Sequence, residues 1–218
     1  MQGIIIVGRG GHARVLLEIL LQSNVTVLGF VDDNTQLHEQ TFNGIATLGT
    51  LTSFTNYYKP GDVLLVNGVG SRGIPTKRKE IYERFKNMGY KFHTTIHPSS
   101  SISPNATLAE GVQVIAGAVV STGCEILENC ILNTNACIGY ESKIEAHTHI
   151  APGATLGFRV SVGKECLVGI RATVDSNITL KEKCLVGAGA VVVDDFPANS
   201  TLLGNPARPF CKTRKNDR

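Results

Sequence analysis

The sequence predicts a chain in two parts, an α/β Rossmann-like half domain followed by an all-β parallel β-helix. Three observations favour this fold class. Residues 1–97 alternate short apolar runs with helical patterns. Residues 102–191 place an aliphatic side chain at every sixth position without a break. The composition, with 23 glycines, 6% aromatic residues and no tryptophan among 218 residues, suits small side chains packed in repeated layers.

The first part has the elements of a small parallel sheet. The apolar run at residues 3–7 predicts a buried strand, and a helical pattern follows residue 12. Further strands are expected at 25–31, 63–66 and 90–95, and a second helix at about 75–88.

Three loops are expected to meet at the carboxyl ends of these strands, where ligands of parallel sheets bind. The glycines of residues 8–12 and 68–70 let the backbone approach a phosphate, and the helix after Gly11 offers free N–H groups. Asp32 and Asp33 could accept hydrogen bonds from a ribose or a base. The pattern G-x-G-x-x-A also fits a plain tight turn, and His12 fits either a ligand contact or a surface position. A half Rossmann unit of this length favours a mononucleotide.

The repeats of the second part predict its core. Fifteen hexapeptides at three per triangular coil give about five coils. We count the aliphatic residue of each hexapeptide as its first position. Small residues then occupy the fifth positions, and we therefore interpret the cysteines there as core residues and not as nucleophiles or ligands. These are Cys124, Cys130, Cys166 and Cys184, whereas Cys137 and Cys211 lie out of that register. A prism with flat sides favours a homotrimer.

Composition and charge exclude several classes of protein. With 42% apolar residues the chain is not disordered, and a net charge of +3 is too weak to indicate nucleic acid as a partner. We expect no membrane span, because no run of about 18 apolar residues occurs. The six cysteines match no zinc spacing, so we expect no metal and a reduced, cytoplasmic protein. The N-terminal apolar run indicates a strand and not a signal peptide.

Several motifs together resemble the bacterial nucleotide-sugar acetyltransferases, which join a Rossmann-like domain to a left-handed hexapeptide β-helix. The motifs are Gly8-Arg9-Gly10-Gly11-His12-Ala13, Phe30-Val31-Asp32-Asp33, Ile96-His97-Pro98-Ser99, Leu132-Asn133-Thr134-Asn135-Ala136, His149-Ile150-Ala151-Pro152-Gly153-Ala154 and Gly204-Asn205-Pro206-Ala207. The resemblance covers almost the whole chain. It implies a nucleotide-sugar-binding domain at 1–97 and an acyltransferase domain with a C-terminal tail at 98–218.

The resemblance also implies roles for individual residues. Gly10, Gly11 and His12 would hold the nucleotide-sugar phosphates, Asp32 and Asp33 would contact the base or ribose, and Gly70 would line the same pocket. Acetyl-CoA, a co-substrate, would contact His149, Ile170 and Ala188 in a groove between two subunits of the trimer. The reaction would be transfer of an acetyl group to a UDP- or GDP-linked 4-amino sugar for surface glycan synthesis.

One position departs from the family. A His followed by an acidic residue usually serves there as general base, and this chain has Tyr140 and Glu141. A phenol ionises near pH 10, which makes it a poor base at neutral pH. Without a general base, acetyl transfer to an amine could still proceed slowly. Alternatively Glu141, His147 or His149 could act as the general base. If His147 has no such role, we expect it to be a solvated turn residue. Alternatively the site only binds ligands.

Three functions therefore stay open. The first is an N-acetyltransferase acting on a nucleotide-linked amino sugar, with Tyr140, Glu141 and His149 as the catalytic candidates. The second is an O-acetyltransferase acting on a sugar or a sialic acid, which the missing His disfavours. The third is a catalytically impaired protein that binds nucleotide sugars.

Overall fold

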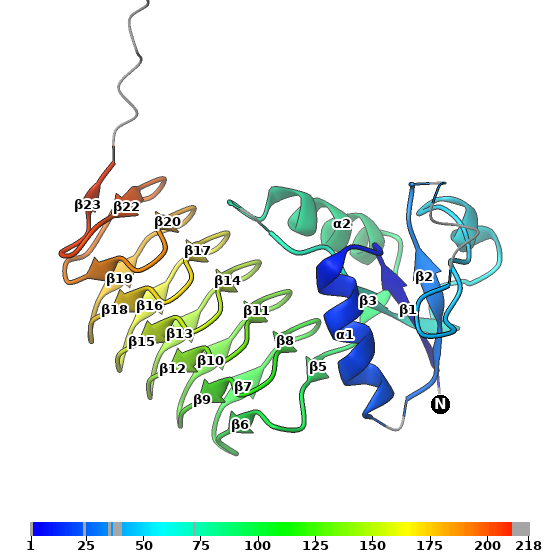
Figure 1. Cartoon of the computed structure of the whole chain (residues 1–218), viewed down its shortest axis with the longest axis horizontal. Helices are drawn as coiled ribbons and strands as arrows, with labels where there is room; N and C mark the ends of the chain where they lie inside the picture. The colour runs from blue at the N-terminus through cyan, green and yellow to red at the C-terminus, as the bar shows by residue number, and fades with distance from the viewer. Residues whose placement is uncertain (1, 24, 35, 37–40, 72, 211–218) are drawn as a thin grey trace, which may run out of the picture.

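The computed structural model describes residues 2–23, 25–34, 36, 41–71 and 73–210. An α/β unit lies beside the first coils of a triangular prism of parallel strands (Figure 1). The predicted fold class is confirmed. Among the described residues, no helix is both long and apolar enough to cross a membrane.

The α/β unit contains one parallel sheet with the strand order β2-β1-β3-β4. Its strands are β1 (Gly3–Val7), β2 (Val27–Val31), β3 (Val63–Asn67) and β4 (Lys91–Phe92), its helices α1 (Gly11–Leu21) and α2 (Thr76–Asn87), and a 3₁₀ helix spans Ser53–Asn56. The strand expected at 90–95 is divided in two. Only β4 joins this sheet, whereas β5 (Thr95–Ile96) pairs with the prism.

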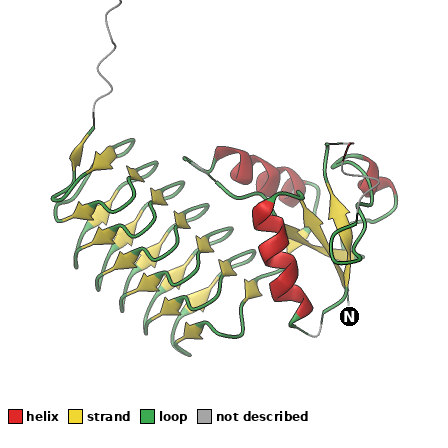
Figure 2. Cartoon of the chain, viewed as in Figure 1, coloured by secondary structure: helices red, strands yellow, loops and turns green. Residues whose placement is uncertain are grey.

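Helix α1 connects the two parts through apolar contacts. Its buried side chains, among them Leu16 and Leu20, share one core cluster with Ile115 and Ile131 of the prism. Helices α1 and α2 cover opposite faces of the sheet, because alternate residues of β1 belong to the core cluster of one helix or of the other (Figure 2). The α/β unit is therefore fixed to the prism by a continuous buried core and not only by a linker.

The prism has three faces, each a parallel sheet whose strands recur every 18 residues. Face 1 contains β5, β8 (Gln113–Val114), β11 (Ile131–Leu132), β14 (His149–Ile150), β17 (Leu167–Val168), β20 (Leu185–Val186) and β22 (Thr201–Leu203), with β23 (Arg208–Pro209) added antiparallel. Face 2 contains β6 (Ser101–Ile102), β9 (Val119–Val120), β12 (Cys137–Ile138), β15 (Thr155–Leu156), β18 (Thr173–Val174) and β21 (Val191–Val192). Face 3 contains β7 (Thr107–Leu108), β10 (Glu125–Ile126), β13 (Lys143–Ile144), β16 (Ser161–Val162) and β19 (Thr179–Leu180).

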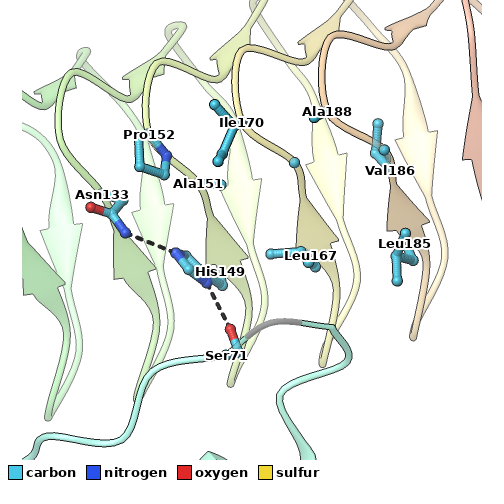
Figure 3. Close-up of a pocket in the computed structure, with 12 residues that line it drawn as sticks. Ser71, Asn133, His149, Ala151, Pro152, Leu167, Ile170, Leu185, Val186 and Ala188 are labelled. Carbon is cyan, nitrogen blue, oxygen red and sulfur yellow. Dashed lines mark hydrogen bonds between the residues drawn. The ribbon is translucent and has the colours of Figure 1, made fainter. Parts of the chain in front are cut away.

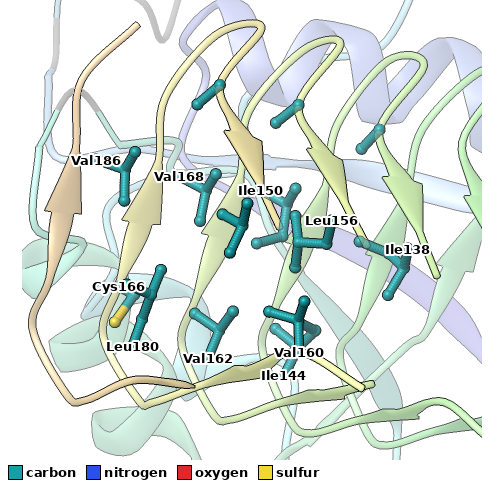
Figure 4. Close-up of a cluster of buried hydrophobic side chains, with 14 of the residues drawn as sticks. Ile138, Ile144, Ile150, Leu156, Val160, Val162, Cys166, Val168, Leu180 and Val186 are labelled. Carbon is teal, nitrogen blue, oxygen red and sulfur yellow. The ribbon is translucent and has the colours of Figure 1, made fainter. Parts of the chain in front are cut away.

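The interior of the prism follows the hexapeptide pattern. Aliphatic first-position residues such as Ile150, Leu156 and Val162 stack inside it (Figure 4). The fifth-position cysteines are buried as predicted, and the Cys124 thiol donates to the Gly139 carbonyl oxygen at 3.1 Å. All five described cysteines are free, and Cys211 lies outside the described residues.

Two features close the coils tightly. At the fourth positions the backbone turns with a positive φ, which Asn129, Glu141 and His147 adopt at 56–61°. At the second positions, glycine is required where coils touch, because a Cβ at Gly139 would collide with the backbone of Gly157. The prism has about six coils instead of the predicted five, because pairing continues through β5 and β22 beyond the 102–191 repeat.

The three edges of the prism differ in what they carry. The chain turns from face 1 to face 2 at the first edge, from face 2 to face 3 at the second, and from face 3 back to face 1 at the third. Residues 133–136, 139–142 and 145–148 are the turns of one coil at these three edges in that order.

Helix α2 lies along the third edge and contacts successive coils. Lys86 Nζ lies 2.9 Å from the Glu110 carboxylate, and Lys79 Nζ lies 2.9 Å from Glu165 Oε1. Between them the Tyr82 ring meets the His147 ring edge-on, with centroids 5.5 Å apart.

His147 is therefore not the solvated turn residue that we expected. The residue is 7% exposed, and Asn129 Nδ2 lies 2.9 Å from its Nδ1. The prediction was wrong because α2, which is distant in sequence, covers this edge.

Candidate functional site

Two pockets meet on the side of face 1 next to the α/β unit, and Ser71 lines both. The apolar pocket, of about 510 Å³, is lined by Ser71, Asn133, His149, Ala151, Pro152, Leu167, Gly169, Ile170, Leu185, Val186, Gly187 and Ala188. The glycine pocket, of about 410 Å³, is lined by Gly8, Arg9, Gly10, Gly11, His12, Asp32, Gly68, Val69, Gly70 and Ser71.

The apolar pocket lies over face 1 and along the first edge of the prism. Figure 3 shows Ile170 and Ala188 on the turns and Leu167 and Leu185 on the strands, with the polar side chains gathered at one end. The three residues predicted to contact acetyl-CoA, namely His149, Ile170 and Ala188, all line this pocket. An elongated apolar groove with a polar end suits a thioester on a flexible arm.

His149 is held between two hydrogen-bond partners. Its Nδ1 lies 2.7 Å from Ser71 Oγ and its Nε2 lies 3.1 Å from Asn133 Nδ2 (Figure 3). Burial lowers the pKa of His149 to about 3, with smaller contributions from His12 and Arg78. The imidazole is therefore neutral at pH 7, and a pKa this low makes it a weak general base.

The glycine pocket surrounds the start of α1. A Cβ built on Gly10 or on Gly11 meets no atom within 4 Å, so the space in front of this turn is open. The first N–H groups of α1 face outward without partners inside the helix, and the helix dipole adds positive potential. Such a turn favours a phosphate.

Two aspartates at the end of β2 have different positions. Asp32 lines the pocket, and its Oδ2 accepts the Arg9 backbone N–H at 2.8 Å. Asp33 does not line it, because Asp33 Oδ1 accepts the Leu51 backbone N–H at 2.9 Å. Of the residues predicted to bind the nucleotide sugar, the structure thus brings together Gly10, Gly11, His12, Asp32 and Gly70.

His12 is also a neutral side chain. Gln113 Nε2 donates to the Asn67 carbonyl oxygen at 2.9 Å, which turns Gln113 Oε1 toward His12. His12 Nε2 then donates to that oxygen at 2.7 Å. Burial and the nearby Arg78 lower the pKa of His12 to about 4. Any phosphate in this pocket is therefore bound by backbone N–H groups and the helix dipole and not by an imidazolium.

Arg78 of α2 lies beneath the glycine pocket and is 1% exposed. Its Nη1 donates to the carbonyl oxygens of Asn67 and Val69 at 2.8 and 2.9 Å, and its Nε donates to the Asn129 carbonyl oxygen at 3.2 Å. Burial lowers the pKa of Arg78 to about 9, which still leaves it charged at pH 7. This guanidinium joins the pocket loop, α2 and the third edge of the prism.

Tyr140 and Glu141 lie on the second edge and line neither pocket. The Tyr140 ring stacks on the Phe158 ring of the next coil, with centroids 5.0 Å apart and planes 6° apart. Glu141 Oε2 accepts from Arg159 Nε at 2.7 Å, and both side chains are exposed. Within one chain, these two catalytic candidates are not brought to His149.

Four polar residues that line the site or contact its histidines were not predicted as site residues, namely Arg9, Ser71, Gln113 and Asn133. A signal for face 1 was present in the repeat. The outward-facing sixth positions of this face are Gln113, Ile131, His149, Leu167 and Leu185, whereas those of face 3 are all polar. Outward apolar residues at every third hexapeptide mark a covered or ligand-binding face. Among the described residues, no group of three or more His, Cys, Asp or Glu side chains could hold a metal ion.

The two neutral histidines predict an acid-sensitive fold. In the unfolded chain a His has a pKa near 6.5. In the folded chain the pKa is about 4 for His12 and about 3 for His149. The unfolded state thus binds more protons below pH 6.5, so the stability that these residues provide is full above that pH and falls below it. We expect a loss of roughly 1.4 kcal/mol per pH unit for each His between pH 6 and pH 4.5.

Urea unfolding at several pH values measures this slope. Replacing His12 by Gln, which cannot titrate, should lower the slope by roughly 1.4 kcal/mol per pH unit. An unchanged slope in this variant would show that folding does not lower the pKa of His12.

Comparisons with known proteins agree with the two-part architecture. A domain family described as the PglD N-terminal domain matches residues 3–85. The acetyltransferase domain of PglB from Neisseria gonorrhoeae has a TM-score of 0.89 and 32% identity, over 96% of this chain and 100% of that one. That domain has also been solved in complex with acetyl coenzyme A.

Two further relatives extend the comparison. PerB from Caulobacter crescentus, solved in complex with CoA and GDP-perosamine, has a TM-score of 0.86 and 29% identity, over 97% of this chain and 98% of that one. The UDP-N-acetylbacillosamine N-acetyltransferase of Bacillus subtilis (strain 168) is 32% identical over 117 residues. This match spans 53% of this chain and 52% of the relative, about half the length of each.

Proposed function

This chain belongs to the nucleotide-sugar acetyltransferase family, and from that premise we propose that it transfers an acetyl group from acetyl-CoA to the amine of a nucleotide-linked 4-amino sugar. The observation that carries the proposal is the meeting of two pockets of different chemistry at Ser71. One pocket suits an acyl-pantetheine arm and the other suits a sugar nucleotide, so their junction is where transfer would occur.

The reaction needs the acetyl thioester at the polar end of the apolar pocket. The amine nitrogen attacks the thioester carbon, a C–N bond forms, and the C–S bond breaks. The proton lost from the nitrogen balances the thiolate that leaves, which gives the amide and CoA as a free thiol. Holding both reactants in adjoining pockets supplies a large part of the rate enhancement.

The glycine pocket would hold the diphosphate of the acceptor. Gly10 and Gly11 leave room for it beside the start of α1, and Gly70 lines the same pocket. The neutral His12 could accept a hydrogen bond through Nδ1 from a hydroxyl of the substrate, but not from the diphosphate itself. The Asp32 carboxylate at the pocket wall would meet a ribose hydroxyl or a base N–H group. These are chemical fits of the residues to the substrate class and leave the base of the nucleotide open.

Thiol release from acetyl-CoA with a panel of UDP-, GDP- and CMP-linked sugars tests the proposal. We expect release with 4-amino sugars and none with the matching 4-hydroxy sugars. Release only with hydroxyl acceptors such as sialic acids would indicate an O-acetyltransferase instead. Binding of nucleotide sugars without release from any acceptor would indicate a binding protein and would overturn the proposed activity.

We propose a homotrimer in which the second edge of one subunit faces the apolar pocket of its neighbour. This would bring Tyr140 and Glu141 to a site that they do not line within their own chain. It would also cover Ile170, which is 54% exposed on the first edge. Light scattering should give about three times the 23.3 kDa chain mass. A monomer would remove any role of Tyr140 at this site.

The proposed substrates also place the activity. Acetyl-CoA and sugar nucleotides are made and used in the cytoplasm, and an acetylated amino sugar nucleotide is a building block for surface glycans. We therefore propose a cytoplasmic step of surface polysaccharide or glycan synthesis.

A further inference from the structure

The polar end of the apolar pocket contains a chain of hydrogen bonds that joins Asn133, His149 and Ser71. The orientation of the Asn133 amide determines which atom donates in each of them. The Thr134 backbone N–H donates to Asn133 Oδ1 at 2.8 Å, so the amide nitrogen of Asn133 is the atom that faces His149. An amide nitrogen can only donate. His149 Nε2 must therefore be the acceptor in this contact.

This contact also determines which nitrogen of the His149 imidazole has the proton. A neutral imidazole has one N–H group, and burial keeps His149 neutral at pH 7. With Nε2 as the acceptor, the proton is on Nδ1, which donates to Ser71 Oγ at 2.7 Å. The hydroxyl proton of Ser71 is then free to point elsewhere, and among the described residues this hydroxyl has no second hydrogen-bond partner.

The position of Ser71 decides where that proton can go. Ser71 is half-buried and is the residue that lines both the apolar and the glycine pocket. Each donor along the chain polarises the next, which strengthens the last O–H as a donor. Such a chain can give a hydrogen bond to a ligand at the junction, but it cannot take a proton from one.

We propose that Ser71, oriented by His149 and Asn133, donates a hydrogen bond to the carbonyl oxygen of the acetyl thioester as that oxygen becomes negative. This role rests on the proposed function. When the amine nitrogen attacks, the carbonyl π electrons move to the oxygen, and the Ser71 O–H stabilises the charge. The electrons return when the C–S bond breaks, and Ser71 keeps its proton throughout. His149 and Asn133 are positioning residues in this scheme.

The first test compares Ser71→Ala with Ser71→Thr in the full-length protein. The probes are acetyl-CoA and whichever UDP- or GDP-linked 4-amino sugar gives the fastest thiol release. Removing one donor to an oxyanion lowers kcat by roughly 10²–10³-fold. We expect a loss of about 10²-fold for S71A, with the KM for both substrates within threefold of the wild type, and a partial rescue by S71T. Ser200→Ala, whose hydroxyl donates to the Pro197 carbonyl oxygen at the far end of the prism, is the control.

A second measurement does not depend on activity. The ¹⁵N shifts of the His149 ring, identified by their absence in His149→Gln, report which nitrogen has the proton. We expect protonation on Nδ1 with no titration between pH 5 and pH 8. Protonation on Nε2 would reverse the chain and overturn the proposal.

The remaining outcomes separate the two proposals. An active wild type with an equally active S71A, or a raised KM with an unchanged kcat, overturns the role of Ser71 alone. A wild type that transfers no acetyl group to any acceptor overturns the proposed function and this role together.

Discussion

Replacing Arg78 by Met is expected to lower the free energy of unfolding by about 1–3 kcal/mol or more, because a buried acceptor that loses its hydrogen-bond donor costs about that much. The substitution leaves the carbonyl oxygens of Asn67, Val69 and Asn129 without the donors that now reach them. Met retains most of the side-chain volume, so the loss would come mainly from the unpaired acceptors. Arg78→Lys should not restore stability, because one ammonium group cannot reach all three carbonyl oxygens in the same geometry.

Thermal and urea unfolding measure this effect. Arg84→Met is a matched control on the same helix, since Arg84 is exposed and contacts Thr52 and the Phe85 ring. It should change stability by less than about 1 kcal/mol. If R78M unfolds within 1 kcal/mol of the wild type, the carbonyl oxygens find other donors and the guanidinium is not what joins the two parts.

Replacing Tyr140 by His is expected to raise kcat/KM at pH 7 by about tenfold or more. A positioned general base contributes roughly 10²–10⁴-fold, and neither pocket supplies one, because His12 and His149 have pKa values of about 4 and 3. We expect an increase smaller than this full contribution, since Glu141, which would orient the new imidazole, is already paired with Arg159.

Tyr140→Phe is the control, because it retains a ring that can stack on Phe158 and removes only the hydroxyl. Steady-state kinetics of both variants, with light scattering to confirm the same assembly, measure the effect. A loss above tenfold in either variant would mean that the phenol has a role of its own. An unchanged rate in Y140H would mean that the second edge does not reach the neighbouring pocket.

The prism could be predicted from the sequence because its contacts repeat. Each aliphatic first position packs on its equivalents 18 residues away, so one local pattern determines the core, the coils and the place of the cysteines. The glycine pocket could be predicted for a similar reason, because the carboxyl ends of parallel strands must meet at one edge of the sheet.

The catalytic contacts could not be predicted in this way. Ser71 meets His149 across 78 residues and His12 meets Gln113 across 101, and no period relates these positions. Asp33 has the same chemistry as Asp32, and only the path of the chain near Leu51 directs its carboxylate elsewhere. The burial of His147 likewise depends on where α2 lies.

The path of α2 along the third edge also helps to determine the register in which the coils of the prism stack during folding. Successive coils are so alike that a chain paired one coil out of step would keep much the same aliphatic core. The helix does not repeat. From Lys79 to Lys86 it rises about 10 Å, at 1.5 Å per residue, whereas Glu165 and Glu110 lie about three coils of 4.8 Å apart.

These two lengths match within the reach of lysine side chains, so α2 acts as a template that only one stacking of the coils satisfies. A coil inserted or deleted between Glu110 and Glu165 would retain the aliphatic core and lose this match. Coils added beyond Glu165 would leave it intact. The fold can therefore lengthen at its C-terminal end without disturbing the contacts of α2 with Glu110 and Glu165.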